Sequence, residues 1–233
     1  MSDSTDVQTD PPATPTPPSG RRHAKTRTSR STFWKELPIL LGAAIVVALL
    51  VRTFVLQTFY VPSESMEHTL NINDRVLVNK LVYDFRSPSR GEVIVFTSPL
   101  DWRTEENEKD FVKRVIGVPG DHVVCCVNGH ITINSVQLNE PYLDPDTGGP
   151  DASPNKFDVT IPANRLWVMG DNRAQSADSA YHWVHNGKNI MEATIPISSV
   201  IGRAFVLFWP PGRATWLSVP KGFSVIPNPS SGP

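Results

Sequence analysis

Residues 60–70 carry two serines, Ser63 and Ser65, on either side of one glutamate. A proline precedes them, and Pro62 favours an extended or turning backbone at Val61. Side chains of an extended segment alternate with a period of two, so both hydroxyls would lie on the same side of the chain. Serines after a proline are usually turn residues. This segment is of more interest because it directly follows the long apolar run and because a candidate base lies downstream.

A serine nucleophile needs a general base, and histidine is the usual partner. His68 is three residues from Ser65, which is too close in sequence for a productive geometry to be assumed. The remaining histidines stand in no obvious triad setting: His23, His122, His130, His182 and His185. The alternative base is a lysine that burial holds in its neutral form.

Lys113 is the best candidate for such a lysine. In a strand it would share one face with Phe111 and Val115, which are both apolar. A neutral amine near neutral pH requires a pKa about 3 below the usual ~10.4, at a cost of about 4 kcal/mol in desolvation and neighbouring positive charge. The alternative is an ammonium group that reaches water along the lysine stem.

A second cluster of polar, turn-forming side chains fills residues 170–179, directly after a predicted strand. A generic surface loop is one interpretation of this composition. The other is a loop that orients a catalytic group by hydrogen bonding. The residues themselves leave both interpretations open.

The composition limits the partners. The chain has 233 residues, 39% hydrophobic and 19% charged, with a formal net charge of -1. Nucleic-acid binding normally brings a basic excess, so no nucleic-acid partner is predicted.

The adjacent Cys125 and Cys126 allow no disulfide framework and would point to opposite faces of a strand. They would not converge with His122 and His130, so no metal site is predicted. The thiols could be buried, paired with each other or exposed.

An apolar run predicts a membrane anchor over residues 37–56. A transmembrane helix needs about 20 mostly apolar residues, and this run is long enough if Arg52 reaches toward the interface. Pro38 would lie in the first turn, where its missing N–H costs little. A buried soluble helix and a cleaved signal peptide are the alternatives, but no small-x-small site follows the run. Basic residues before it predict a cytoplasmic N-terminus and a single-pass protein with everything after about residue 57 outside.

The rest of the chain is predicted to be mainly β. Residues 1–36 read as a disordered, basic tail, residues 57–219 as an extracytoplasmic antiparallel β domain, and residues 220–233 as a flexible tail. Within the domain, residues 101–110 are a charged, mobile insertion and residues 144–156 a surface loop. Strands are predicted at residues 75–83, 92–96, 111–118, 123–133 with a hairpin turn at Asn128-Gly129, 137–143, 157–161, 165–169 and 200–209.

Together these stretches resemble the bacterial type I signal peptidases, the membrane-bound Ser/Lys proteases that remove signal peptides from exported proteins. The resemblance covers residues 37–209. It rests on the anchor and on four blocks in this order: residues 62–70, 90–96, 113–121 and 170–179. Each block alone is modest evidence, whereas all four behind a single N-terminal anchor are highly specific.

The resemblance implies a serine endopeptidase of the bacterial cell membrane with a mostly antiparallel β domain and no cofactor. Ser65 matches the family's nucleophile and Lys113 its general base. The Ser63 hydroxyl and the Ser65 N–H match the oxyanion hole. Ser176 matches the serine that hydrogen-bonds the lysine, and Asp178 matches an acidic residue that supports the loop.

The resemblance also implies substrates and partners. Its pockets accept small side chains at the first and third positions before the cleaved bond, and by position they would be lined by Val61, Met66, Leu70, Phe111 and Val112. The implied partners are preproteins with signal peptides, the lipid bilayer and the secretion translocon. His68 stands where the family often has Pro, and Ala180 where it often has Arg. Asp178 therefore lacks its expected salt-bridge partner, for which Arg173 or Arg203 could substitute.

Two other functions fit parts of the sequence. A β-rich envelope protein that binds or scaffolds would need no catalytic serine. Ser/Lys self-cleavage, as in the fold-related repressor proteases, is disfavoured because a membrane anchor precedes the β domain and no helix-turn-helix pattern does.

Overall fold

The computed structural model describes residues 30–50, 55–103, 109–143 and 151–229. The chain divides into two compact units, Met1–Ala44 and Ile45–Pro233. The predicted disordered segment before residue 30, most of the charged insertion and the first half of the 144–156 loop lie outside the described residues.

Helix α1 covers Arg30–Leu50 and contains most of the predicted anchor. It begins at Arg30 instead of residue 37, because the intervening residues include no glycine or proline, so Pro38 lies inside the helix and not in its first turn. Leu56, the predicted end of the span, is instead the first residue of strand β1, and residues 51–54 between them are not described. Within the described part of the chain, no helix combines the length and apolarity needed to cross a membrane.

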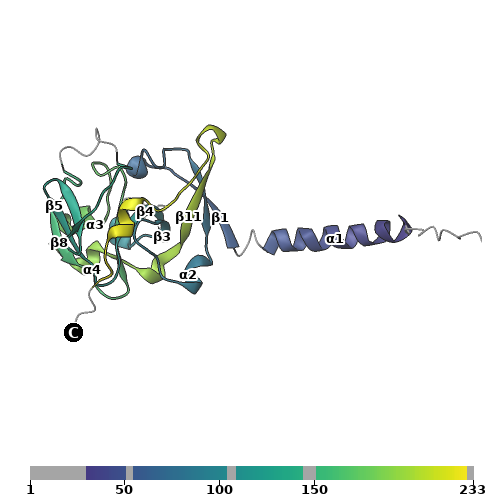
Figure 1. Cartoon of the computed structure of the whole chain (residues 1–233), viewed down its shortest axis with the longest axis horizontal. Helices are drawn as coiled ribbons and strands as arrows, with labels where there is room; N and C mark the ends of the chain where they lie inside the picture. The colour runs from purple at the N-terminus through teal and green to yellow at the C-terminus, as the bar shows by residue number, and fades with distance from the viewer. Residues whose placement is uncertain (1–29, 51–54, 104–108, 144–150, 230–233) are drawn as a thin grey trace, which may run out of the picture. The chain divides into compact units, whose positions relative to one another are not determined.

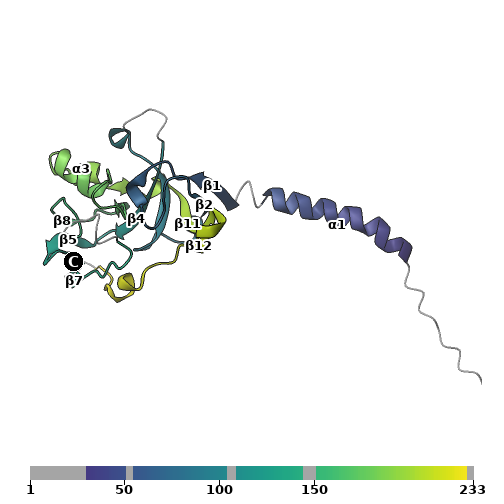
Figure 2. The same ribbon diagram turned by 90° about the horizontal axis from the view of Figure 1, so that it is seen from above.

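A large antiparallel sheet forms the frame of the β domain (Figures 1 and 2). Its strands follow the order β1-β2-β11-β3-β4-β9-β10, and β12 also pairs with β11. The strands are β1 Leu56–Tyr60, β2 Arg75–Asn79, β3 Val93–Thr97, β4 Asp110–Gly117, β9 Arg165–Met169, β10 Ile195–Pro196, β11 Val200–Trp209 and β12 Thr215–Trp216. The strands predicted at residues 92–96, 111–118, 165–169 and 200–209 are confirmed to within one residue.

Strand β3 is buried on both faces, as its unbroken apolar run indicates. Val93 and Val95 pack into one hydrophobic cluster, while Ile94 and Phe96 pack into another. Successive strand residues point to opposite faces, so the two clusters lie on the two sides of the sheet. The neighbouring strand β4 pairs in register, with Lys113 opposite Ile94. The core therefore fixes the backbone position of Lys113.

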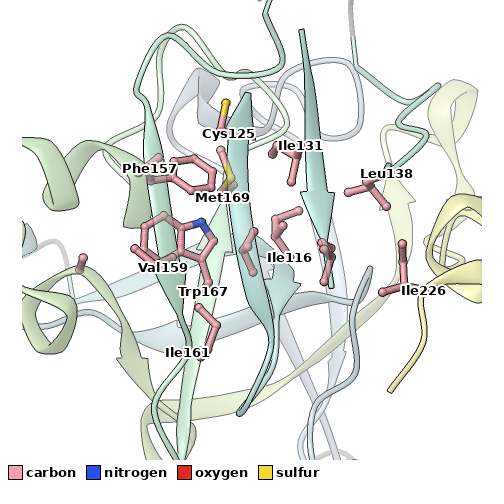
Figure 3. Close-up of a cluster of buried hydrophobic side chains, with 14 of the residues drawn as sticks. Ile116, Cys125, Ile131, Leu138, Phe157, Val159, Ile161, Trp167, Met169 and Ile226 are labelled. Atoms are coloured by element: carbon pink, nitrogen blue, oxygen red, sulfur yellow. The ribbon is translucent and has the colours of Figure 1, made fainter. Parts of the chain in front are cut away.

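A smaller sheet has the order β7-β6-β5-β8. Its strands are β5 His122–Val127, β6 His130–Ile133, β7 Val136–Gln137 and β8 Phe157–Thr160. Figures 1 and 2 show β5 and β8 at the opposite end of the β domain from β1. The predicted hairpin is confirmed, because Asn128 and Gly129 turn with φ of 50° and 83°. Buried side chains from β5, β6 and β8 meet those of β4 and β9, including Ile116 and Trp167 (Figure 3).

Two predicted strands are too long. Strand β2 stops at Asn79, whose Oδ1 accepts hydrogen bonds from the backbone N–H groups of Leu81 (3.0 Å) and Val82 (3.2 Å). This turn leads into the short helix α2 (Val82–Phe85), so residues 80–83 are not strand. The strand predicted at residues 137–143 is reduced to β7, and Pro141 in the remainder has no N–H to donate to a ladder.

Short helical segments complete the domain. Helices α3 (Ser179–His185) and α4 (Ile190–Ala193) lie between β9 and β10 in the chain. Single 3₁₀ turns cover Glu64–Met66, Leu100–Trp102, Ile197–Ser199, Pro211–Arg213 and Lys221–Val225. The segment after residue 220, whose composition predicts flexibility, buries Phe223 and Ile226 in the hydrophobic cluster that contains Ile116 and Trp167. These two apolar side chains supply the burial that a Pro/Ser-rich segment otherwise lacks.

Candidate active site

The two serines of the opening segment lie on a short turn after β1. Ser65 belongs to the 3₁₀ turn Glu64–Met66, and Ser63 precedes it with an extended backbone (φ −125°, ψ 160°). Their Oγ atoms are 3.3 Å apart. The predicted placement of both hydroxyls on one side is confirmed, although a turn and not a strand brings them together. Met66, 1% exposed, anchors this turn in the core.

Lys113 contacts the Ser65 hydroxyl. It lies within β4 with only 4% of its surface exposed, and its Nζ donates a hydrogen bond to Ser65 Oγ at 2.6 Å. The Nζ is 5.7 Å from the centre of the Phe111 ring, and Val115 is fully buried, as the predicted shared face requires. A neutral amine in the same place could accept the serine proton along this line. The pair is therefore suited to activating a hydroxyl nucleophile.

The polar loop of residues 170–179 touches the Glu64–Met66 turn, here termed the nucleophile turn after the predicted role of Ser65, through backbone atoms. The Asn172 N–H donates to the Ser65 carbonyl oxygen at 3.1 Å. A Cβ on Gly170 would lie 2.3 Å from that same oxygen and 2.4 Å from Ser176 Oγ. Such distances exclude any side chain at this position, so glycine is required by the close approach. The loop therefore packs on the turn that carries Ser65, so the interpretation as a generic surface loop is wrong, while its role in orienting a catalytic group stays a prediction.

Ser176 is 8% exposed, and its Oγ is buried without a hydrogen-bond partner among the residues that the structure describes. Buried hydroxyls normally have a partner, so an orphaned one marks a place where a substrate atom, a water or a lysine could bind. The hydrogen bond expected between Ser176 and Lys113 stays a prediction.

Asp178 is the N-cap of helix α3 and also binds the loop. Its Oδ1 accepts from the N–H groups of Ala180 (3.0 Å) and Tyr181 (3.3 Å), and its Oδ2 accepts from Gly170 N at 2.9 Å. Three N–H donors thus satisfy this carboxylate, which is 2% exposed, without an arginine at residue 180. The suggestion that Arg173 or Arg203 replaces that arginine is wrong: Arg173 pairs with Glu140, and Arg203 with Glu92.

A buried ion pair joins β4 to the start of the loop. Arg114 donates from Nε to Asp171 Oδ1 at 2.9 Å and from Nη2 to Oδ2 at 2.6 Å. Its Nη1 donates to the Gly91 carbonyl oxygen at 2.8 Å, and Thr69 Oγ1 donates to Asp171 Oδ2 at 2.5 Å. The Arg114 guanidinium also lies over the Tyr142 ring, 4.2 Å from its centre. Although burial opposes its charge, the Asp171 carboxylate raises the pKa of Arg114.

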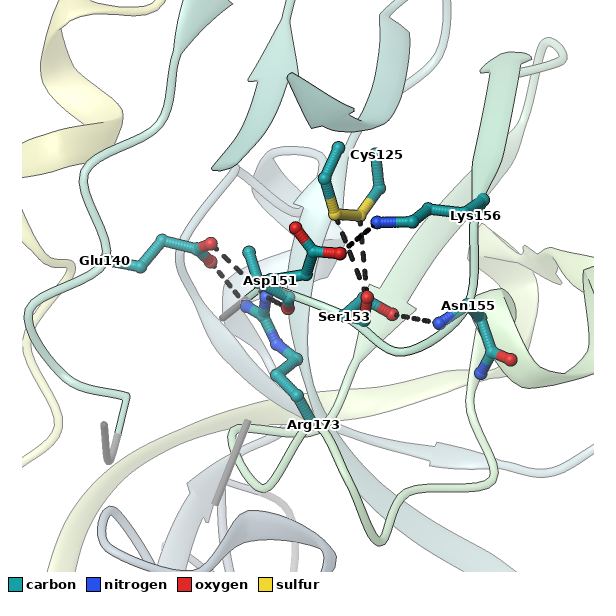
Figure 4. Close-up of a disulfide and its surroundings, with 9 residues drawn as sticks. Cys125, Glu140, Asp151, Ser153, Asn155, Lys156 and Arg173 are labelled. Atoms are coloured by element: carbon teal, nitrogen blue, oxygen red, sulfur yellow. Dashed lines mark hydrogen bonds and ion pairs between the residues drawn. A yellow bond between two sulfur atoms is a disulfide. The ribbon is translucent and has the colours of Figure 1, made fainter. Parts of the chain in front are cut away.

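A second buried ion pair holds the other side of the loop (Figure 4). Arg173 binds both carboxylate oxygens of Glu140, and its Nε donates to the Gly170 carbonyl oxygen at 3.0 Å. Tyr142 Oη donates to Glu140 Oε1 at 2.7 Å. Burial, reinforced by this carboxylate, raises the pKa of Tyr142 well above its usual range. Gly170 is therefore fixed at both its N–H and its carbonyl.

The histidines near the loop do not form a triad. His182 stacks on Trp102 with ring centres 4.4 Å apart and has no hydrogen bond to its buried Nε2 in the described part of the chain. Burial, with smaller effects from His185 and Lys113, lowers the pKa of His182 to about 4. His68 is exposed and adopts a φ of 74°, which proline cannot reach. The backbone here therefore explains why this chain has no proline at residue 68.

The predicted pocket residues divide into two groups. Val61, Met66 and Leu70 are at most 2% exposed and belong to the hydrophobic cluster beneath the nucleophile turn. Phe111 and Val112, on β4, are only partly buried. That these five residues line the pockets for a bound peptide stays a prediction.

The cysteines form a disulfide with each other, which decides between the three states left open by the sequence. Their sulfurs are thus unavailable as thiolate ligands. No group of three or more His, Cys, Asp or Glu side chains is placed to hold a metal ion within the described ranges.

The sequence indicated no role for Arg114, Asp171 or Glu140, and it suggested Asp178 instead of Glu140 as the partner of Arg173. A signal for the first pair was available: an arginine within an apolar strand has to find a buried anion. The second pair had no such signal, because Glu140 lies in a segment predicted to be strand, far in sequence from the loop that it supports.

A buried amine contacts a serine hydroxyl on the larger sheet of an antiparallel β domain, and this arrangement is suited to acyl transfer through a hydroxyl nucleophile. Residues 34–209 match the family model for signal peptidase, peptidase S26. The chain belongs to this family of serine endopeptidases, in the type I signal peptidase class.

Several signal peptidases are similar to this chain over most of its length. The probable signal peptidase I of Mycobacterium leprae (strain TN) is 40% identical over 228 residues, covering 79% of this chain and 78% of that protein. Signal peptidase I of Mycobacterium tuberculosis (strain ATCC 25618 / H37Rv) is 38% identical over 221 residues, covering 79% and 75%. Signal peptidase I of Leptolyngbya laminosa is 36% identical over 221 residues, covering 93% and 98%.

Proposed function

We propose that this enzyme removes signal peptides from preproteins by cleaving after small-x-small sites, with Ser65 as nucleophile and Lys113 as general base. The 2.6 Å contact between Lys113 Nζ and Ser65 Oγ is the observation that carries the proposal. Burial of Lys113 favours its neutral amine, the form that can accept a proton. The proposed chemistry requires no cofactor.

The reaction proceeds in two acyl transfers. Lys113 takes the Ser65 proton as Oγ attacks the peptide carbonyl, and it then gives this proton to the leaving amine. It next activates the water that hydrolyses the acyl-enzyme. The Ser63 hydroxyl and the Ser65 N–H stabilise the oxyanion, and donors of this kind contribute about 3–4 kcal/mol each. The 3.3 Å distance between the Ser63 and Ser65 hydroxyls supports this role.

Ser176 and Asp178 act indirectly in this proposal. When substrate is bound, the buried Ser176 hydroxyl orients the amine of Lys113. This contact would give Ser176 Oγ a hydrogen-bond partner, which it does not have among the described residues. Asp178 holds Gly170 and the start of α3, and so keeps Ser176 beside the nucleophile turn.

The substrate would bind as an added strand, with small side chains in pockets near Val61, Met66, Leu70, Phe111 and Val112. We extend the proposal to the membrane. The apolar run that begins at residue 37 anchors the enzyme with its N-terminus in the cytoplasm, and the basic residues before it set this orientation. Enzyme and preprotein then share one bilayer surface, where the secretion translocon delivers the substrate.

The test uses the full chain in detergent and a peptide with an Ala-x-Ala site. Ser65→Ala and Lys113→Ala are expected to lower kcat/KM by at least about 10³-fold, because each removes a reacting group. Ser224→Ala and Lys156→Ala are the matched controls, since both side chains are exposed. Unchanged cleavage in either active-site variant would overturn the assignment and leave the binding-protein alternative.

A pH–rate profile tests the base separately. Activity should rise with pH through the pKa of Lys113, since only the neutral amine accepts a proton. That ionisation should disappear from single-turnover profiles of any residual activity in Lys113→Ala. If no ionisation can be assigned to a lysine with a lowered pKa, the role of Lys113 has to be abandoned.

A further inference from the structure

The disulfide between Cys125 and Cys126 lies against the segment of residues 151–156, here termed the strap (Figure 4). The sulfurs of the two cysteines are 4.0 and 3.8 Å from the Ser153 carbonyl oxygen. Ser153 is 1% exposed, although the sequence predicts a surface loop here. The middle of the strap is therefore packed directly on the disulfide.

The opposite side of the strap holds Arg173. The Ala152 carbonyl oxygen accepts a hydrogen bond from Arg173 Nη1 at 2.7 Å, and the Ala152 N–H donates to the Gly129 carbonyl oxygen at 2.7 Å. Arg173, whose side chain is 1% exposed, has its remaining contacts with Glu140 and with the Gly170 carbonyl oxygen. The strap thus fills the space between the disulfide and this guanidinium.

Gly170 completes the path to the reacting atoms. It approaches the Ser65 carbonyl and the Ser176 hydroxyl so closely that no Cβ could be accommodated. A small movement of Arg173 would therefore move Gly170 against the nucleophile turn. Misplacement of reacting groups by about 1 Å can cost about 100-fold in rate.

We propose that the Cys125–Cys126 disulfide is a positioning element of the active site, and that its oxidised state keeps the strap, Arg173 and Gly170 in the productive arrangement. The inference rests on the proposed function, because the path matters only if Ser65 is the nucleophile. It also assigns a redox sensitivity to the enzyme. Cys126 is partly exposed, so a reductant reaches its sulfur before that of the buried Cys125.

The redox step is a two-electron exchange. A dithiol reductant transfers two electrons and two protons to the pair, which breaks the S–S bond, leaves two thiols and converts the dithiol into its disulfide. The reverse reaction needs an organic disulfide as oxidant. Two separate thiols no longer form one fixed surface for Ser153, so the strap loses its support. Extracytoplasmic compartments favour the oxidised, positioning state.

The experiment titrates the full-length enzyme in detergent with a dithiol/disulfide buffer. Mass spectrometry after alkylation gives the fraction of reduced pairs, and peptide cleavage gives kcat and KM. Reduction should lower kcat by roughly 3- to 30-fold in proportion to the reduced fraction, with KM nearly unchanged. The Cys125→Ser/Cys126→Ser variant should reproduce the reduced rate and ignore the buffer.

Two further variants locate the effect. Lys156→Ala removes an exposed ion pair with Asp151 from the same strap and should keep both the full rate and the redox response. Glu140→Gln weakens the other support of Arg173. Its effect on kcat should be smaller in the double cysteine variant than in the oxidised enzyme, because both changes act through one arginine.

Three outcomes overturn the inference: thiols that are free in enzyme isolated under oxidising conditions, a kcat that does not follow the reduced fraction, or a reduced enzyme that has unfolded at the assay temperature. Failure of the proposed function looks different, since cleavage would then survive Ser65→Ala. Cleavage that requires Ser65 but ignores the redox state refutes this inference alone.

Discussion

The two walls of the candidate active site, strand β4 and the loop of residues 170–179, are held in place by different interactions. Strand β4, which carries Lys113, pairs with β3 on one side and β9 on the other. Residues 170–179 lie outside the strands and are held by side chains instead: Asp178 binds the Gly170 N–H, and Arg173 binds its carbonyl.

This difference shows where the site can tolerate change. A ladder of backbone hydrogen bonds does not depend on any one side chain, so the amine keeps its position through most substitutions in the sheet. The loop depends on a few buried charges, and removal of one partner leaves the other unpaired in the interior. The Arg114–Asp171 pair connects the two walls.

The largest effect is expected at this connection. Arg114→Met keeps the strand and much of the side-chain volume but leaves the Asp171 carboxylate buried, with Thr69 as its hydrogen-bond donor. Breaking a buried ion pair costs about 3–5 kcal/mol, so the free energy of unfolding in urea should fall by this amount.

Two companion variants sharpen this test. Arg114→Met/Asp171→Leu removes both charges and should recover part of the loss, because no unpaired charge remains. Lys156→Ala, at an exposed ion pair, should change stability by less than about 1 kcal/mol. A loss in Arg114→Met as small as that of Lys156→Ala would show that the connection is screened by water.

The stability of the wall formed by residues 170–179 and the following helix α3 should also be the more sensitive to acid. The pKa of His182, on α3, is lowered to about 4, whereas an unfolded histidine titrates near 6.5. Between these values the unfolded chain binds a proton that the folded protein does not. The contribution of His182 to stability is therefore fully present above pH 6.5 and decreases as the pH falls toward 4, by about 2 kcal/mol at pH 5.

His182→Phe preserves a ring against Trp102 and should remove this part of the pH dependence of unfolding. His130→Gln, at an exposed histidine, should retain it. Equal pH slopes in the wild type and His182→Phe would mean that the folded protein binds the proton near the normal pKa.

The sequence-based predictions succeeded where one local pattern decides the structure. The apolar run of β3 and the Asn128-Gly129 turn can each be predicted from neighbouring residues alone. The contact of Lys113 with Ser65 was anticipated from the family resemblance, while alternation alone indicated only the apolar face of Lys113. The match of Lys113 to the lysine of the family was what indicated that its amine would be buried close to Ser65.

The predictions failed where distant side chains decide. Glu140 reaches Arg173 from a segment whose pattern suggested a strand, and neither residue indicates the other. The end of β2 at Asn79 depends on a side-chain turn that competes with an apolar run. Ser153 is buried next to the disulfide, which the composition of the strap could not indicate.

The smallest effect, and the most direct test of how the loop is held, is expected at Asp178. Asp178→Ala removes the α3 cap and the acceptor for Gly170 N, and should cost about 1–2 kcal/mol of stability together with a loss of activity. Asp178→Asn keeps a side-chain acceptor and should retain most of the stability and most of the activity.

Asn189→Ala is the matched control, which should lose stability without losing activity. It removes the cap of α4, in which Asn189 Oδ1 accepts a hydrogen bond from Met191 N at 3.0 Å. Ala180 offers Asp178 an N–H in place of the arginine expected from the family resemblance, so hydrogen bonding should be what the loop requires. If Asp178→Asn were as damaging as Asp178→Ala in cleavage and urea unfolding, the negative charge would be essential, and the loop would be held by electrostatics at this residue as it is at Asp171.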